Sequence, residues 1–264
     1  SLSKAFRLQY YLGINPVEPQ LAMLSTFVQT QSEYELRKGN PHLKPYQAYI
    51  NQLSISFRKH ETTASISTYI QYSSHPFTNN PPTYDAAANM FVYTQANQHS
   101  FTHFQVRLNA SQSLFSQAFK LFGWLTLNRY INNGLSFFTT YTDIIGGLSL
   151  TYDHTKWGIQ ANFCSAITTM FNETKTRTAP NLQLSAYYNI RRLRFTLSVN
   201  NPFMSVATTV STLNSELVSS TSHVFQKYNN NLVQLSLSYH FRKGKARNLQ
   251  KQMDNADNDA GVVR

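Results

Sequence analysis

Cysteine, charged residues and long apolar runs are all scarce in this sequence. Its 264 residues include a single cysteine, Cys164, which excludes an internal disulfide and a thiolate metal cluster. Charged residues make up only 13% of the chain, about half of the usual globular share. No apolar run reaches the roughly 18 residues of a membrane helix, and SLSKAFRLQYYL at the start lacks the basic and apolar blocks of a signal peptide. These absences argue against a disulfide scaffold, a helical membrane protein and a soluble enzyme with a charged surface.

Neutral polar residues and aromatic rings take the place of the missing charge. Aromatic residues make up 14% of the sequence, yet the mean hydropathy is −0.37 because Ser, Thr, Asn, Gln and Tyr are abundant. The formal net charge of +11 would suit an acidic partner such as nucleic acid. However, the basic clusters at 58–60, 191–194 and 242–247 lie far apart and form no stripe. The composition favours a sheet with one apolar and one neutral-polar face, and we expect no nucleic-acid partner.

Apolar and polar residues alternate with a period of two along most of the chain, and helical periodicity is nearly absent. In FQVRLNA (104–110), for example, F, V, L and A alternate with Q, R and N. The same pattern recurs in AFRLQYYL, TASISTYIQY, WGIQANFCSA and LVQLSLSYHF. These stretches predict roughly ten two-faced strands, many of them long enough to cross a membrane at a tilt. We interpret 91–114 as one strand, because the C-terminus of the last strand then lies at the end of the sheet with the short turns. An additional strand there would move that C-terminus to the end with the long loops.

The connections between these strands alternate between short and long. The short ones are 58–61, 153–156 and 190–192, and the long, irregular ones are 13–45, 74–87, 131–144, 170–179 and 200–229. Soluble β-sandwiches have no reason to sort their loops in this way. A membrane barrel does, because its periplasmic turns are tight and its extracellular loops are long. The sequence therefore predicts an all-β fold, a transmembrane antiparallel up-and-down β-barrel, with a soluble carbohydrate-binding β-sandwich as the weaker alternative.

Three stretches resemble, in order along the chain, motifs from the C-terminal barrel half of TonB-dependent receptors, in particular the Bacteroidetes outer membrane beta-barrel group. KGNPHLKPY (38–46) resembles a motif that leads from a long extracellular loop into a descending strand. LRFTLSVNNPFM (193–204) resembles the penultimate strand, and LVQLSLSYHFRKGK (232–245) the closing strand. In the first motif the matching residues are Gly39, Asn40, Pro41, Leu43, Lys44 and Pro45, while Tyr46 stands where an acidic residue is commonest.

The resemblance implies a bacterial outer-membrane protein whose residues 1–241 form part of a barrel of roughly 22 strands. Residues 242–264 would be a polar, disordered periplasmic tail. Tyr239 and Phe241 would carry the insertion signal of the closing strand. Because open strand edges are costly in lipid, we expect a longer polypeptide or another chain to complete the barrel. The implied partners are outer-membrane lipid and lipopolysaccharide, the remaining strands and plug, TonB acting through that plug, and the barrel-assembly machinery.

No arrangement of side chains predicts catalysis, so we expect no enzyme, no metal and no cofactor. His99 and His103 share a strand face but would lie about 13 Å apart, too far to share a metal. Ligand contacts would come from the long loops, where stacking and hydrogen-bonding residues gather. The candidates are Phe77, Asn79, Asn80 and Tyr84. The resemblance implies energised uptake of a siderophore, glycan or peptide; the alternative is a structural barrel subunit of an envelope complex without transport.

Overall fold

The computed structural model describes residues 5–80, 82–115, 117–215, 218–228 and 230–241. Strands make up most of this part of the chain, in agreement with the period-two pattern. Its single α-helix, α1, spans Leu21–Leu24. Among the described residues no helix has the length and apolar character needed to cross a membrane. The predicted polar tail, 242–264, lies outside the described residues.

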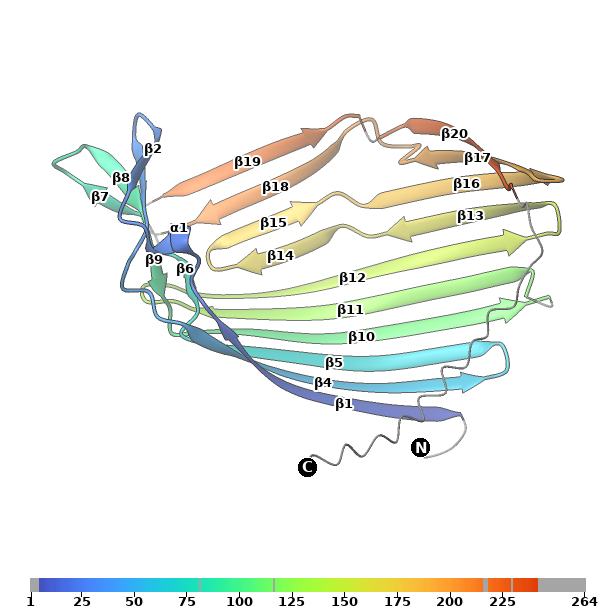
Figure 1. Ribbon diagram of the computed structural model, residues 1–264, viewed down its shortest axis with the longest axis horizontal. Helices are drawn as coiled ribbons and strands as arrows, with labels where there is room; N and C mark the ends of the chain where they lie inside the picture. Colours follow the sequence, from blue (N-terminus) through green and yellow to red (C-terminus); the bar gives the residue numbers. More distant parts are fainter. Residues whose placement is uncertain (1–4, 81, 116, 216–217, 229, 242–264) are drawn as a thin grey trace, which may run out of the picture.

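Ten strands form one continuous curved wall in which every neighbouring pair is antiparallel (Figure 1). In spatial order they are β1 (Phe6–Val17), β4 (Tyr46–Lys59), β5 (Thr62–Ser74), β10 (Ser100–Leu114), β11 (Phe119–Asn133), β12 (Phe138–Asp153), β13 (Trp157–Cys164), β16 (Asn181–Ile190), β17 (Leu193–Asn200) and β20 (Leu232–Tyr239). The predicted all-β class and the ten antiparallel wall strands are confirmed. The wall is open in the described part of the chain, since β1 and β20 each have one neighbour in it.

Short and long connections lie at opposite ends of the wall (Figure 1). The turns at one end are 60–61, 115–118, 154–156 and 191–192, and the larger connections at the other are 18–45, 75–99, 165–180 and 201–231. The prediction of a long loop at 131–144 is wrong, because only residues 134–137 connect β11 to β12. Their ladder continues into residues of loop-like composition, with Asn132 opposite Thr139.

The long connections carry small sheets of their own. These contain β2 (Val28–Ser32), β3 (Glu35–Lys38), β6 (Phe77–Asn79), β7 (Thr83–Asp85), β8 (Met90–Tyr93), β9 (Gln95–Asn97), β14 (Ile167–Phe171), β15 (Thr174–Thr178), β18 (Ala207–Asn214) and β19 (Ser219–Gln226). The stretch 91–114 crosses the wall once, as predicted, but only β10 does so. The strand is interrupted at Gln98, between β9 and β10. The backbone N–H of Gln98 donates to the carbonyl of Pro76, and its side-chain oxygen accepts from the N–H of Leu135.

The two faces of the wall differ sharply in polarity. One cross-strand row is apolar on five neighbouring strands: Leu8, Ile55, Ile66, Leu108 and Leu125. The next cross-strand row points to the opposite face and consists of Gln9, Ser54, Ser67, Arg107 and Thr126. Burial is inverted relative to a soluble protein, since the Leu125 side chain is 48% exposed and the neighbouring Thr126 only 2%. An exposed apolar face and an opposite polar face are what lipid outside and a polar lumen inside require.

Aromatic pairs on the apolar face lie near both ends of the strands. At the long-loop end the rings of Tyr49 and Tyr72 are 6.2 Å apart between centroids. At the short-turn end Tyr152 and Trp157 are 5.2 Å apart. Rings with an apolar body and a polar tip favour the two membrane interfaces. These pairs therefore delimit the apolar band at its two ends.

Candidate functional site

The GNP stretch, Gly39–Asn40–Pro41, joins two loops that are far apart in the sequence. A Cβ atom on Gly39 would lie 2.6 Å from the carbonyl oxygen of Met23 and closer still to that of Ser25, so only glycine fits this approach. Asn40 follows, with its backbone N–H donating to the Met23 carbonyl at 2.7 Å. Its side-chain amide donates to the carbonyl of Gln95 at 2.9 Å. The stretch thus holds the 18–45 connection against the 75–99 connection.

The rest of the motif fixes the start of β4. Pro41 lies in a turn, and Leu43 beyond it is 6% exposed. The N–H of Lys44 donates to the Asn97 side-chain oxygen, and the Asn97 amide donates back to the Lys44 carbonyl, both at 2.9 Å. Pro45 comes next, and strand pairing begins after it. Proline is compatible with this place because no ladder N–H is needed there.

We expect Gly39→Ala to detach the loops locally without unfolding the wall. The added methyl group would collide with two backbone carbonyls, which cannot rotate away as side chains can. The 18–45 connection should become cleavable by protease while the barrel keeps its heat-modifiable gel mobility. Gly123→Ala is a suitable control, since its nearest new contacts would be at 3.7 and 3.9 Å. Equal protease resistance of both variants would contradict this role of Gly39.

A cleft of about 340 Å³ lies among the long connections. Asn79, Asn80 and Tyr93 line it from the 75–99 connection. Phe171 and Asn172 line it from the β14–β15 hairpin, together with Thr169, Glu173, Thr174 and Thr176. Leu213 lines it from β18. The side-chain oxygen of Asn80 is buried and has no hydrogen-bond partner among the described residues. The cleft therefore combines aromatic faces with amide and hydroxyl groups, the usual means of binding a polar organic ligand.

The structure brings together two of the four predicted ligand-facing residues. Asn79 and Asn80 line the cleft. The ring of Phe77 instead packs edge-on against Tyr46, with centroids 5.0 Å apart. Tyr84 packs on Phe91 and its hydroxyl donates to Asn89 in the β7–β8 hairpin. Sequence reasoning missed the residues of 167–178, whose aromatic and amide side chains at FNE (171–173) were the available signal.

The tip of the β14–β15 hairpin is attached to the polar face of the wall. The rings of Phe171 and Phe101 meet at 5.8 Å between centroids. The N–H of Asn172 donates to the Asn132 side-chain oxygen at 3.0 Å, and the Thr139 hydroxyl donates to the Asn172 carbonyl at 2.6 Å. Phe101, Asn132 and Thr139 occupy one cross-strand row of the lumen-facing side. The hairpin therefore folds inward, so one side of the cleft stands over the end of the lumen.

Two further contacts hold this hairpin, one near its base and one beside its tip. The N–H of Thr168 donates to the Asp143 carboxylate at 2.8 Å. The ammonium group of Lys175 lies 4.4 Å from the ring centroid of Tyr141. Both partners belong to β12, the strand beneath the hairpin. The hairpin is thus fixed to the wall at its base as well as at its tip.

Neutral polar side chains form a network on the lumen face below the cleft. Asn128 accepts from Gln105 at 2.9 Å and contacts the His103 ring nitrogen at 3.1 Å. The His103 ring stacks on Tyr130 at 4.6 Å and meets Tyr69 edge-on at 5.7 Å. No group of three His, Cys, Asp or Glu side chains among the described residues could hold a metal ion. This surface can position a passing polar solute through hydrogen bonds and ring contacts.

One tyrosine of the cleft has a perturbed acidity. Burial of Tyr93 raises its pKa, and the nearby Glu35 carboxylate raises it further, both as a negative charge and as a hydrogen-bond acceptor. The Tyr93 hydroxyl donates to Glu35 Oε1 at 3.3 Å. The phenol therefore stays protonated at neutral pH and presents a fixed donor between β3 and β8. Glu35 lies on the strand before the GNP stretch, so this contact also joins the two loops.

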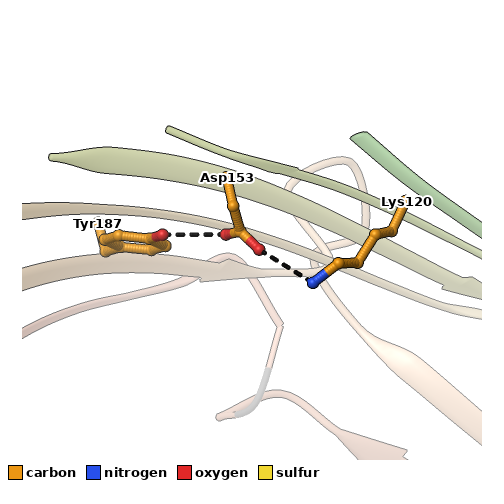
Figure 2. A network of polar contacts seen from close by, with 3 residues as sticks. All are labelled: Lys120, Asp153 and Tyr187. Atoms are coloured by element: carbon orange, nitrogen blue, oxygen red, sulfur yellow. Dashed lines mark hydrogen bonds and ion pairs between the residues drawn. The ribbon is translucent and has the colours of Figure 1, made fainter. Parts of the chain in front are cut away.

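A different polar cluster lies near the short-turn end of the lumen face (Figure 2). The Tyr187 hydroxyl donates to one oxygen of Asp153 at 2.9 Å, and the Lys120 ammonium lies 3.6 Å from the other. The Arg194 guanidinium covers the Tyr187 ring at 4.2 Å, and the ring in turn lies over Gly158. The ion pair is partly exposed and contributes below about 1 kcal/mol. Its role is to connect β11, β12 and β16 at this rim.

The predicted insertion-signal residues lie at the same end of the wall. Tyr239 ends β20, and Phe241 follows with its ring 6.5 Å from the Tyr239 ring. The Phe241 side chain is 73% exposed. We expect Phe241→Asp to lower severalfold the amount of heat-modifiable protein in the outer membrane, because an assembly signal would lose its terminal aromatic ring. Phe203→Asp, a matched change in a long connection, should assemble normally; equal levels of the two variants would refute the signal.

Comparison with known proteins places these features in context. The sequence model of the outer membrane protein beta-barrel family matches residues 3–239. No curated protein matches the chain. Two structures of variants of the ferric enterobactin receptor from Pseudomonas aeruginosa are similar to it, with TM-scores of 0.56 and 0.57 and 12% sequence identity. The aligned parts cover 77% and 78% of this chain but only 33% and 34% of the receptor chains, so the chain spans about a third of their length. At this identity the likeness shows a shared fold.

Proposed function

Because this chain belongs to the outer membrane protein beta-barrel family, we propose that it forms part of the barrel of a TonB-dependent receptor that takes up a bulky nutrient. The chain lies in the bacterial outer membrane. Its short turns face the periplasm and its long connections face the outside. The cleft between these connections would be the first binding surface that a nutrient meets. The receptor is proposed to be of the Bacteroidetes type, as the GNP stretch suggests.

The observation that carries this proposal is the position of the cleft. It opens among the outer connections, and its β14–β15 side is tied to lumen-facing residues of β10, β11 and β12. A ligand bound there would lie above the polar network around Asn128. The shared fold with a ferric enterobactin receptor supports the proposal that this chain is part of a receptor barrel. The amide, hydroxyl and aromatic groups suit a siderophore, a glycan or a peptide.

Several partners follow from the proposal. The free edges of β1 and β20 need further strands, from the same or another chain, because unpaired backbone groups cost several kcal/mol each in lipid. A plug domain inside the completed barrel would couple transport to TonB. Lipopolysaccharide and membrane lipid would surround the apolar face, and the barrel-assembly machinery would insert it. We further propose that the barrel acts by binding and passage and not as an enzyme.

Blocking the cleft tests the transport role. In cells whose only copy of the gene carries Asn79→Trp, the indole should fill the cleft without touching the wall. Uptake of the cognate nutrient should fall by about tenfold or more, as expected when a binding site is lost. Growth on ferric siderophores, oligosaccharides or peptides as the limiting source identifies the nutrient class. Thr83→Trp, an exposed site outside the cleft, is the control.

Depletion of TonB provides the second arm of this experiment. Uptake through the wild-type protein should stop when TonB is removed, and the Asn79→Trp and Thr83→Trp strains should then become indistinguishable. Undiminished uptake without TonB, or growth of a gene-deletion strain at the wild-type rate on all three nutrient classes, would sink the receptor proposal. Either result would favour a structural barrel without transport.

A further inference from the structure

A polar hollow of about 660 Å³ lies at the extracellular end of β4 and β5, on the opposite face from the lumen network. Its lining includes Gln47 and Ser74, two residues from the aromatic pair Tyr49 and Tyr72 on their respective strands. The Tyr49 hydroxyl donates to Gln47 Oε1 at 2.7 Å, which places both side chains on the lipid-facing side. The hollow therefore adjoins the outer membrane interface, where lipid headgroups lie.

The side chains around this hollow suit an anion. Lys44 supplies an ammonium group, and His42 and His75 supply ring nitrogens; all three residues are exposed. The one ion pair found between described residues joins Lys120 and Asp153 at the other end of the wall. No carboxylate among the described residues therefore forms an ion pair with any of these three groups. A phosphate, with several acceptor oxygens and negative charge, fits such a donor set.

The backbone that carries these donors is held rigidly. Asn97 donates to the carbonyls of both Lys44 and His75, at 2.9 and 2.8 Å, and accepts from the Lys44 N–H. His75 has a φ of 55°, a left-handed conformation that is costly for a residue with a side chain. Pro45 restricts the segment beside Lys44. Because the backbone is already ordered, only the side chains that carry the donors have to lose entropy when a ligand binds.

We propose that this hollow binds the phosphate-bearing headgroup of an outer-leaflet lipid. The apolar rows continue below it, with Ile70 and Ile66 following Tyr72 on the same face of β5. Acyl chains can lie on this part of the wall while the phosphate meets Lys44 and the two imidazoles. A free phosphate ion would use the same donors but gain nothing from the apolar surface. The site is separate from the nutrient cleft, so it does not depend on the receptor proposal.

A binding titration with the complete protein in detergent tests the site. The probe is diphosphoryl lipid A, and the variant combines His42→Gln with Lys44→Gln; His75 is left unchanged because of its backbone conformation. We expect the Kd for lipid A to rise by about tenfold or more, since charge-assisted hydrogen bonds to phosphate are lost. Lys156→Gln, an exposed lysine at a periplasmic turn, should leave the Kd within about twofold of the wild type.

Two further arms separate a lipid from an ion. Dephosphorylated lipid A should bind the wild type as weakly as diphosphoryl lipid A binds the double variant, and excess inorganic phosphate should not displace lipid A. The single variant Lys44→Gln should show an intermediate Kd, and heat-modifiable gel mobility verifies that each variant is folded. An unchanged Kd in the double variant, equal binding of the dephosphorylated lipid, or displacement by inorganic phosphate would each overturn the proposal.

Discussion

Leu125→Arg should destabilise the folded protein in lipid by about 2–4 kcal/mol, the usual cost of a basic residue at the bilayer midplane. Leu125 is central in β11 and lies between Leu108 and Gly146 on the neighbouring strands. Its side chain is 48% exposed, and it belongs to the continuous apolar row. Far from both aromatic pairs, an arginine there cannot easily reach the headgroups. The measurement is the free energy of unfolding in phosphocholine vesicles by guanidinium titration.

Gln160→Arg is the matched control for this prediction. Gln160 lies on the lumen face of β13, between Thr151 and Ser185, and is exposed there. An arginine at that place can be hydrated by lumen water, and we expect a change below about 1 kcal/mol. If Leu125→Arg and Gln160→Arg changed the free energy of unfolding equally, the assignment of the apolar face to lipid would be wrong.

The wall was predictable because its signals are local in the sequence. Alternation within each strand reports the two faces directly, and the contrast between short and long connections reports the two ends. The error at 131–144 has a physical reason. Asn132 and Thr139 have the composition of a loop, but above the apolar band a ladder can continue with polar side chains on both faces. Composition alone does not distinguish such an extension from an irregular loop.

The candidate site was only partly predictable, because it depends on contacts between distant segments. The loop HPFTNNPPTYD was recognisable as a surface for ligands, but alternation could not tell that Asn79 faces the cleft while Phe77 packs on Tyr46. The β14–β15 hairpin enters the site through the contact of Asn172 with Asn132, 40 residues apart. Similarly, the prolines around residue 41 indicate a stiff segment, but the closeness of Gly39 to Met23 is visible only in the fold.

Gly147→Ala should also destabilise the wall, by about 1–3 kcal/mol, the usual cost of overpacking a tight site. The indole of Trp124 lies across Gly147, and an added Cβ would fall 2.5 Å from its Nε1 and 2.9 Å from the carbonyl oxygen of Phe163. The ring can move, but the carbonyl belongs to the ladder between β12 and β13. The Arg107 guanidinium, 5.1 Å from the Trp124 ring centroid, would lose its partner as the ring shifts.

Fluorescence can distinguish this mechanism from a general loss of stability. The chain has two tryptophans, so a change in emission at Trp124 can be isolated in a Trp157→Phe background. Gly147→Ala should shift the Trp124 emission and lower the free energy of unfolding together. Gly123→Ala places the same methyl group on the adjacent strand, 3.7 Å from Leu148, and should change neither. An unshifted emission in a destabilised Gly147→Ala variant would mean that the carbonyl of Phe163, and not the indole, resists the methyl group.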